Sequence, residues 1–387
     1  MSTHPYSTMT AGIVGTGFMG VAHTEALRRL GVHVKGIVGS TPERARKKAE
    51  QTNLPDMYES VEALLADPDI DVVHITTPNH LHHAQVSAAI DAGKHVLCEK
   101  PLAVSIDEGR DLVARAAAKG VIGAVCFNQR YYPNVHQARS MVAAGELGSV
   151  RLVTGGYLQD WLLFETDWNW RLESEKSGDL RAVADIGSHW FDNVEFITGA
   201  RIAAVMADLH TFHQQRTRPV GEVETFASHT VGEVERVTES VASDDAAGML
   251  LRFDNGARGT ATVSQISPGR KNFLNWEIDC TKSAISFNTE NPEDLWVGHR
   301  GQPNQIRKRD SSMMHPAAAA TVGYPAGHVE GYPDTFRALF NDVYAHVLSG
   351  MAGPALYPTF TDGLRSLIVC DAVAHSASSG TWAQVES

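Results

Sequence analysis

Short apolar runs alternate with stretches of helical periodicity in the first part of the chain. The apolar runs are rich in valine and isoleucine, which is typical of strands buried on both faces. They fall at residues 11–15, 32–38, 71–76, 94–98 and 121–126. The segments between them place apolar residues at helical spacing, at 18–30, 42–51, 80–92 and 105–119. Strands and helices that alternate with short links predict a parallel sheet with helices on both faces.

After residue 128 the pattern changes to longer strands. Strand-like segments fall at 148–161, 247–253, 257–266, 275–280 and 283–287, and helical periodicity returns at 135–144, 187–198, 334–349 and 360–378. Asn255-Gly256 separates two strand-like segments and indicates a hairpin, because both residue types tolerate positive φ. The polar stretch 213–240 has little pattern, and we expect a surface excursion there. The second part therefore predicts a mostly antiparallel sheet.

Composition narrows the class of protein. The formal net charge of −12 argues against nucleic acids and anionic membranes as partners. No apolar run approaches the roughly 18 residues of a membrane span, and the N-terminus lacks the pattern of a signal peptide. The cysteines Cys98, Cys126, Cys280 and Cys370 have no metal or disulfide spacing, and three of them lie in apolar surroundings. We therefore expect a cytoplasmic protein with reduced thiols.

A glycine-rich motif, Gly15-Thr16-Gly17-Phe18-Met19-Gly20, follows the first predicted strand and opens the first predicted helix. The first glycine permits a tight turn, the second lets the backbone approach a pyrophosphate, and the third allows close helix–strand packing. The motif alone is a weak signal, but the strand and helix around it agree with it. It predicts that these residues bind the pyrophosphate of a dinucleotide.

The end of the second predicted strand carries no acid, where NAD-binding proteins often place one for the ribose 2′-hydroxyl. Ser40 and Thr41 offer hydroxyl groups, and Arg44 offers a cation that can pair with a 2′-phosphate. These residues favour NADP over NAD as the cofactor. Two alternatives stay open: a serine also serves the 2′-hydroxyl of NAD, and Arg44 can be a solvated helix residue.

Three further motifs carry a family resemblance: Thr77-Pro78-Asn79-His80-Leu81-His82, Glu99-Lys100-Pro101, and Asp185 four residues before His189. With the glycine-rich motif, in this order, they make the chain resemble the glucose–fructose oxidoreductase / inositol dehydrogenase / rhizopine-catabolism (Gfo/Idh/MocA) family from residue 11 to about residue 380. The resemblance implies an N-terminal Rossmann domain, residues 1–128, that binds NAD(P). It also implies a C-terminal α+β domain, residues 129–387, with an open and mostly antiparallel sheet for substrate binding and oligomerisation.

The resemblance assigns catalytic roles to Lys100, Asp185 and His189. Oxidation of a hydroxyl requires a base for the proton, and the ordinary pKa of histidine suits that task near neutral pH. A carboxylate four residues away on a helix can orient the imidazole, and a lysine can stabilise a developing alkoxide. The spacing of Asp185 and His189 by itself is more typical of a helix-surface pair, and the other motifs favour the catalytic role. The resemblance also implies that the peptide bond before Pro101 is often cis.

Other positions match the family less specifically. The cofactor-binding candidates, beyond the motif and strand tip above, are Thr77, Pro78, Asn79, His82, Glu99, Lys100 and Asn128. The substrate-binding candidates are Lys100, Arg130, Tyr131, Trp161, Trp170, His189 and His328. Tryptophan rings suit the C–H faces of a pyranose or cyclitol, although at least one of Trp161, Trp168 and Trp170 is expected in the core. For Arg130, a structural ion pair is an equal alternative.

Histidines cluster at positions 80, 82 and 83, but their motif favours a loop and helix start over a metal site, and we expect no metal. The sequence therefore predicts an NAD(P)-dependent oxidoreductase that transfers a hydride between the nicotinamide and a hydroxyl or keto carbon of a sugar, glycoside or cyclitol. Its partners are that small molecule and copies of itself, as a homodimer or homotetramer. The alternative is a non-catalytic NAD(P)-binding sensor or regulator on the same fold.

Overall fold

The computed structural model describes residues 5–220 and 235–386. Contacts divide the chain into two compact units: Met1–Asn128 with Pro333–Leu367, and Gln129–Tyr332 with Ile368–Ser387. The sequence analysis assigned every residue after 128 to the second domain, whereas residues 333–367 group with the first unit. An apolar helix face shows that a helix is buried but does not show against which core.

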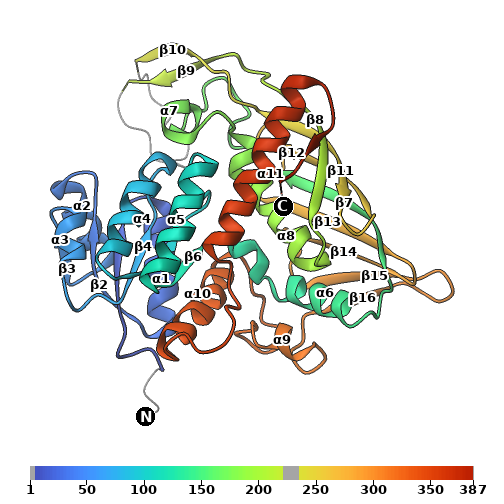
Figure 1. The fold of residues 1–387 in the computed structure, drawn as a ribbon, viewed down its shortest axis with the longest axis horizontal. Coiled ribbons are helices and arrows are strands. Elements are labelled where there is room, and N and C mark those ends of the chain that lie inside the picture. Colours follow the sequence, from blue (N-terminus) through green and yellow to red (C-terminus); the bar gives the residue numbers. More distant parts are fainter. Residues whose placement is uncertain (1–4, 221–234, 387) are drawn as a thin grey trace. The chain divides into compact units, whose positions relative to one another are not determined.

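The first unit is built on a six-stranded parallel sheet in the order β3-β2-β1-β4-β5-β6 (Figure 1). Its strands are β1 (Thr10–Val14), β2 (His33–Val38), β3 (Asp56–Tyr58), β4 (Val72–Ile75), β5 (His95–Cys98) and β6 (Gly123–Val125). The alternating pattern predicted a parallel sheet and five of these strands, but not β3. The order reverses between β1 and β4, and ligands of such sheets bind at this switch point, beyond the carboxyl ends of the strands.

Helices connect these strands, α10 joins the same unit from later in the chain, and Figure 1 shows α4 beside α5. They are α1 (Phe18–Leu30), α2 (Pro42–Thr52), α3 (Val61–Leu65), η1 (Asn79–Leu81), α4 (His82–Asp91), α5 (Ile106–Lys119) and α10 (Tyr332–Leu348). The boundary between units falls inside α11 (Phe360–Ser379). The hydroxyls of Thr41, Ser60 and Ser105 cap three of these helices, since each accepts a backbone N–H of the first turn.

The second unit is built on a nine-stranded sheet in the order β16-β15-β14-β13-β7-β12-β11-β8-β17. All its neighbours are antiparallel except β7 and β12. The strands are β7 (Val150–Leu158), β8 (Ile202–His210), β11 (Ala246–Phe253), β12 (Arg258–Ser264), β13 (Phe273–Cys280), β14 (Ala284–Asn288), β15 (Asp294–Gly298), β16 (Gln305–Lys308) and β17 (Ala383–Gln384). The predicted hairpin at Asn255-Gly256 is confirmed: it joins β11 to β12, with Gly256 at φ 90°.

Short helices accompany this sheet, together with the last part of α11. The short helices are η2 (Asn128–Tyr131), α6 (Pro133–Ala143), η3 (Trp170–Leu172), α7 (Ser174–Ser177), the π-helix η4 (Val183–Gly187), α8 (Ser188–Thr198) and α9 (Pro316–Ala319). Helices α6 and α8 pack against each other, and α8 also contacts β7 and β13. Among the described residues, no helix combines the length and the apolar character that crossing a membrane requires.

The stretch 213–240 is not simply a surface excursion. It contains the antiparallel pair β9 (Gln215–Pro219) and β10 (Arg236–Ser240), and residues 221–234 lie outside the described part. Arg216 on β9 is fully buried and donates to the buried carboxylate of Asp245 at 2.8 Å. A polar segment can hold a buried arginine in this way only because an acid distant in the sequence meets it, and local pattern does not report such a partner.

His136 on α6 gives the second unit a dependence on pH. Its ring packs 5.0 Å from the ring of Tyr131 and 5.1 Å from that of Phe196, measured between centroids. Burial, together with the charges of Arg130 and Arg139, lowers the pKa of His136 to about 3. The folded protein therefore keeps this histidine neutral at pH values where the unfolded chain protonates it.

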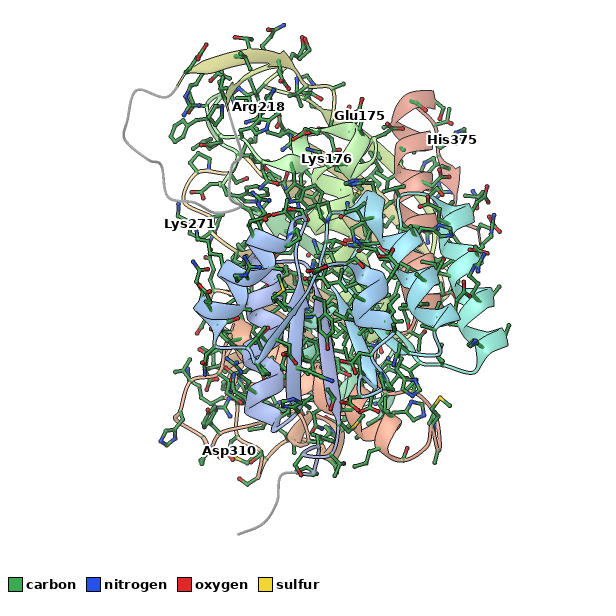
Figure 2. The ribbon with its side chains drawn as sticks, turned by 90° about the vertical axis from the view of Figure 1, so that its left-hand side faces the viewer. Glu175, Lys176, Arg218, Lys271, Asp310 and His375 are labelled. Carbon is green, nitrogen blue, oxygen red and sulfur yellow. The ribbon has the colours of Figure 1, made fainter. Side chains whose placement is uncertain are left out.

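Because the folded pKa is depressed, the stability from His136 is present above about pH 6.5 and is lost as the pH falls towards 3. Between pH 8 and pH 5 this single group should lower the free energy of unfolding by about 2 kcal/mol. In His136→Gln, urea unfolding at the two pH values should show a difference smaller by about that amount. His375→Gln, at an exposed position on α11 (Figure 2), is the control and should retain the wild-type difference. An unchanged difference in His136→Gln would contradict the prediction.

Candidate active site

The glycine-rich motif forms the turn between β1 and α1 in the first unit. Gly15 has φ 119°, and a Cβ there would lie 2.5 Å from Oγ1 of Thr76, so only glycine fits. A Cβ on Gly20 would lie 2.2 Å from the carbonyl oxygen of Gly15, which shows how closely α1 approaches the turn. A Cβ on Gly17 would meet no described atom within 4 Å. The three glycines thus have the geometry that a pyrophosphate site requires, with open space at the second.

The tip of β2 places its polar groups side by side. Nη1 of Arg44 donates to Oγ of Ser40 at 3.1 Å, so the guanidinium lies next to the serine hydroxyl. The hydroxyl of Thr41 caps α2 by accepting the backbone N–H of Arg44 at 3.3 Å. Glu43 lies in the first turn of the same helix. The guanidinium of Arg44 and the hydroxyl of Ser40 therefore lie where the 2′-substituent of a cofactor ribose is expected.

His82 is fully buried, which differs from the role in cofactor contact that the resemblance implies. Its Nδ1 lies 2.8 Å from the carbonyl oxygen of Pro101, and its Nε2 lies 2.8 Å from that of Thr77. Both ring nitrogens thus lie within hydrogen-bonding distance of main-chain oxygens, so His82 links the loop after β4 to the loop after β5. Thr77 also donates to Oε1 of Gln85 at 2.6 Å, while Asn79 is buried at the start of η1.

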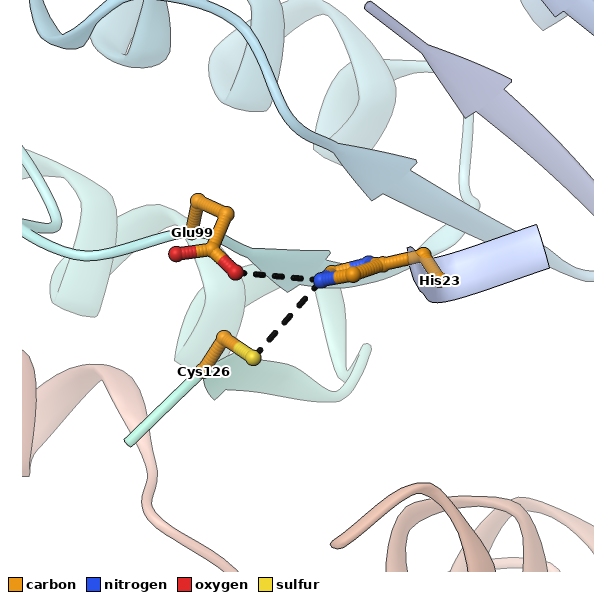
Figure 3. A group of neighbouring side chains, drawn as sticks. All are labelled: His23, Glu99 and Cys126. Carbon is orange, nitrogen blue, oxygen red and sulfur yellow. Dashed lines mark hydrogen bonds and ion pairs between the residues drawn. The ribbon is translucent and has the colours of Figure 1, made fainter. Parts of the chain in front are cut away.

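Glu99 and Lys100 follow β5, and the Lys100–Pro101 bond is cis, as the resemblance implies. Glu99 is buried, and its Oε1 lies 3.0 Å from Nε2 of His23. One side-chain atom that could bind a metal ion from each of His23, Glu99 and Cys126 lies within 4.8 Å of the other two (Figure 3). Their hydrogen bonds to one another account for this closeness. The buried amide of Asn128 donates to Oγ1 of Thr335 at 2.9 Å.

The predicted acid and base of the second unit lie on consecutive helical segments. Asp185 belongs to the π-helix η4, which runs directly into α8, where His189 is the second residue. A single π-helical turn in an α-helix is rare and occurs often at functional sites. His189 is buried, and its ring centroid lies 6.2 Å from that of Tyr157, whose hydroxyl bonds to Asn272 and Gln129. The segment is helical, so the spacing of four places the two side chains near one face.

Two side chains hold the carboxylate of Asp185. Nε of Arg171 donates to Oδ1 at 3.0 Å, and Nε2 of Gln265 donates to Oδ2 at 2.8 Å. The amide of Gln265 is itself fixed, because its Oε1 accepts from the buried Arg181 at 3.0 Å, and Arg181 pairs with the buried Asp245. These interactions orient the carboxylate from both sides. The sequence pattern did not single out Gln265, since it belongs to no motif and lies far from Asp185 along the chain.

The tryptophans of segment 161–170 divide between core and surface. Trp168 is buried in a small cluster with Leu162 and other apolar residues, which confirms that at least one of the three is core. Trp161 and Trp170 are partly exposed. The guanidinium of Arg171 lies 4.5 Å from the ring centroid of Trp170 and 5.8 Å from that of Trp161. Two indole rings thus flank the arginine that holds Asp185.

The remaining substrate candidates have different surroundings. Arg130 is buried and makes a bidentate pair with Asp192, at 2.7 and 2.5 Å, which favours the structural ion pair over substrate binding. Tyr131 is buried against His136. The side chain of His328 is exposed, and its carbonyl oxygen accepts from the buried Arg309 at 2.6 Å. The loop of His328 is therefore anchored through its backbone, while the imidazole stays accessible.

Comparison with known proteins identifies the family of this chain. Residues 9–127 match the oxidoreductase family with an NAD-binding Rossmann fold, and residues 135–286 match the GFO/IDH/MocA C-terminal domain. The chain is 30% identical to the levoglucosan dehydrogenase of Pseudarthrobacter phenanthrenivorans, over 97% of this chain and 98% of that protein. The chain belongs to the Gfo/Idh/MocA oxidoreductase family. Membership confirms the resemblance and the two-part fold, and it supports an enzyme over a sensor.

Two further family relatives bear on the cofactor and the substrate. A structure of levoglucosan dehydrogenase in complex with NADH and levoglucosan is similar with a TM-score of 0.86 and 28% identity, and the match covers 98% of this chain and 100% of that one. The D-xylose 1-dehydrogenase (NADP(+)) 2 of Haloferax volcanii is 39% identical over 38% of this chain and 46% of its own length. As a Gfo/Idh/MocA oxidoreductase with an NAD-binding Rossmann domain, the protein uses a nicotinamide dinucleotide.

Proposed function

We propose that the protein transfers a hydride between a nicotinamide cofactor and a ring hydroxyl or keto carbon of a sugar, glycoside or cyclitol. The observation that carries this proposal is the carboxylate of Asp185, which Arg171 and Gln265 orient at the helical segment that leads into His189. A carboxylate oriented from both sides beside a buried histidine is typical of a proton-transfer site.

His189, Asp185 and Lys100 have separate roles in the proposed proton transfer. In the oxidative direction, His189 takes the proton of the reacting hydroxyl, and the negative charge of Asp185 stabilises the imidazolium that forms. Lys100 donates a hydrogen bond to the same substrate oxygen and stabilises its developing negative charge. A bound nicotinamide would supply the hydride acceptor for oxidation and the hydride donor for reduction. Gly15, Gly17 and Gly20 would hold the pyrophosphate of that cofactor at the turn.

A cyclic polyol fits the chemistry of the second unit. Trp161 and Trp170 are partly exposed, and indole rings pack against the C–H faces of pyranose and cyclitol rings. Two partly exposed polar side chains lie next to segment 161–170 in the sequence, Asp160 and Arg171. The relatives named for levoglucosan and D-xylose act on molecules of this class. We propose that the rings bind one face of the sugar while these polar groups bind its hydroxyls.

A substrate panel tests this proposal. Initial rates at 340 nm with sugars, anhydrosugars, glycosides and inositols should give kcat/KM values at least about 100-fold above those for linear or apolar alcohols, because only cyclic polyols fill both the aromatic and the polar contacts. Trp170→Ala should raise KM for the best cyclic substrate more than it lowers kcat. Trp382→Ala is the matched control, because its indole stacks on Arg252, 4.0 Å away, in the same unit. A short linear alcohol as the best substrate would contradict the proposal.

For the cofactor, we propose that NADP(H) binds at least as well as NAD(H). The hydroxyl of Ser40 and the guanidinium of Arg44 stand together at the tip of β2, where they suit a 2′-phosphate. The relatives include one crystallised with NADH and one named for NADP(+), so their names do not decide the preference.

The variant Ser40→Asp should shift the preference towards NAD by about ten- to thirtyfold, because its carboxylate repels a 2′-phosphate and accepts from a free 2′-hydroxyl. Calorimetric titration of NADH and NADPH into wild type and variant measures the shift. Ser105→Asp at the cap of α5 introduces the same charge elsewhere in the first unit and should leave the ratio unchanged. A wild type that strongly prefers NADH, with a ratio of the two dissociation constants that Ser40→Asp leaves unchanged, would contradict this proposal. The strand tip would then not distinguish the 2′-hydroxyl from the 2′-phosphate.

A further inference from the structure

A chain of buried hydrogen bonds leads through the first unit to Glu99, and the proposed function leaves most of its members unused. The hydroxyl of Tyr344 on α10 lies 2.9 Å from Nε2 of His74 on β4. Nδ1 of His74 lies 3.0 Å from Nδ1 of His23 on α1, and Nε2 of His23 lies 3.0 Å from Oε1 of Glu99. Tyr344 and both histidines are fully buried (Figure 3 shows the end of the chain at Glu99).

Counting protons along these contacts gives the chain one direction. An ionised carboxylate only accepts, so Nε2 of His23 must carry a proton. A neutral His23 then accepts at Nδ1, so His74 donates from its own Nδ1. A neutral His74 accepts at Nε2, and the hydroxyl of Tyr344 donates to it. Every contact is satisfied with two neutral imidazoles and one negative charge, which lies on Glu99.

The surroundings favour this arrangement over its reverse, which needs a protonated Glu99. Burial holds the pKa of His74 well below its usual range, so His74 is neutral. Burial raises the pKa of Glu99, but the hydrogen bond from His23 and the charge of Lys100 act against it, and the pKa of Glu99 lies below its ordinary value. Oε2 of Glu99 also accepts the backbone N–H of Lys100 at 3.2 Å.

Other ionisable groups face the chain from the packed elements. Burial raises the pKa of the Cys126 thiol well above its usual range, so Cys126 adds no charge beside Glu99. The other titratable and charged groups that act on the chain are Tyr6, Asp71, His82, Cys98 and Lys100. The rings of Phe336 and Phe340 cover His23, with centroids 5.7 and 4.8 Å away. The negative charge of Glu99 therefore lies in dry surroundings, where electrostatic interactions are strong.

The topology places this charge on the nicotinamide side of the cofactor. The pyrophosphate turn follows β1, and the adenosine ribose is expected at the tip of β2, on one side of β1. Strands β4 and β5 lie on the other side, and Glu99 follows β5 directly. A dinucleotide that spans the switch point therefore extends its nicotinamide half towards the strand end that carries Glu99.

We propose that Tyr344, His74 and His23 are positioning residues that hold Glu99 as a carboxylate, and that its charge makes the protein prefer the oxidised cofactor, with its cationic nicotinamide, over the neutral reduced one. The inference rests on the proposed function, since it requires a nicotinamide cofactor.

A pair of variants at Glu99 separates charge from shape. Glu99→Gln keeps the shape and removes the charge, whereas Glu99→Asp keeps the charge with a shorter reach. Calorimetric titration with NAD⁺ and NADH, or with the phosphorylated pair if these bind better, gives the ratio of the two dissociation constants. Glu99→Gln should reduce the preference for the oxidised form by about five- to twentyfold, the size of one charge–charge interaction. Glu99→Asp should retain most of it.

A pair of tyrosine variants tests the rest of the chain. Tyr344→Phe removes the donor to His74 and should reduce the same preference by about two- to fivefold, the effect of one hydrogen bond. Tyr6→Phe is the matched control, because Tyr6 is buried beside Tyr344 and its hydroxyl bonds to Asn341 instead. Equal effects of Tyr344→Phe and Tyr6→Phe would overturn the role of the chain.

Nitrogen NMR of the wild-type protein labelled at histidine provides a test that requires no variant to fold. Its signals should report a proton on Nε2 of His23 and on Nδ1 of His74, with the other two nitrogens unprotonated. A charged His23, or the opposite tautomers, would overturn the inference. A wild type that binds neither cofactor would overturn both the proposed function and this inference. Normal binding with a ratio that Glu99→Gln leaves unmoved would overturn the inference alone.

Discussion

His189→Asn should lower kcat by about 10²–10⁴-fold while leaving the dissociation constant of the cofactor within a factor of about two. The asparagine side chain has no group that can take a proton near neutral pH, so the reacting hydroxyl would lose its base. His189 belongs to the second unit, whereas the glycine turn and the strand tip that are proposed to hold the cofactor belong to the first. Turnover and cofactor binding should therefore separate in this variant.

Steady-state rates of wild type and His189→Asn from pH 6 to pH 9 measure the effect, with calorimetry for the cofactor. The wild-type profile should fall at low pH, where the base is protonated, and the residual activity of the variant should lack that fall. His210→Asn on β8 provides the matched control, since His210 is exposed in the same unit, with its ring centroid 4.5 Å from that of Phe212. Turnover at the wild-type rate across this range would remove His189 as the base.

Lys100→Ala should lower kcat by about 10²–10³-fold, the usual effect of removing one donor to a developing oxyanion. Lys100→Arg should not restore the rate, because a guanidinium is larger and planar and cannot replace a compact ammonium group. The backbone N–H of Lys100 donates to Oε2 of Glu99 at 3.2 Å, so the main chain is held where the side chain begins.

The comparison of kcat and KM among wild type, Lys100→Ala and Lys100→Arg tests the role of the lysine. Loss in kcat with little change in cofactor affinity supports a contact made to the reacting oxygen. Lys119→Ala is the control, because Lys119 lies in the last turn of α5 in the same unit, and its Nζ donates to the carbonyl oxygen of Asp91 at 2.9 Å. Full activity in either Lys100 variant would exclude Lys100 from the mechanism.

Local pattern was sufficient wherever the physical cause is local. The Val/Ile runs predicted the parallel strands because a strand buried on both faces has no polar side. The glycine motif predicted its turn because neighbouring atoms leave no room for a Cβ at Gly15 or Gly20. The hairpin at Asn255-Gly256 followed from the positive φ that its turn requires. The motifs at Lys100, Asp185 and His189 added a function because they are short, ordered and chemically specific.

Contacts between distant segments could not be predicted in this way. Gln265 donates a hydrogen bond to Asp185, Asp192 pairs with Arg130, and the buried Arg216 pairs with Asp245. The spacing of these residues along the chain predicts none of the three contacts. Residues 333–367 join the first unit because α10 brings Tyr344 and its phenylalanines to the buried His23 and His74. Burial of a polar group depends on a partner that only the folded chain brings near. The sequence alone therefore predicted the strands buried on both faces, the glycine turn and, through the family resemblance, the class of reaction, and the tertiary structure decided which side chains orient the reacting groups.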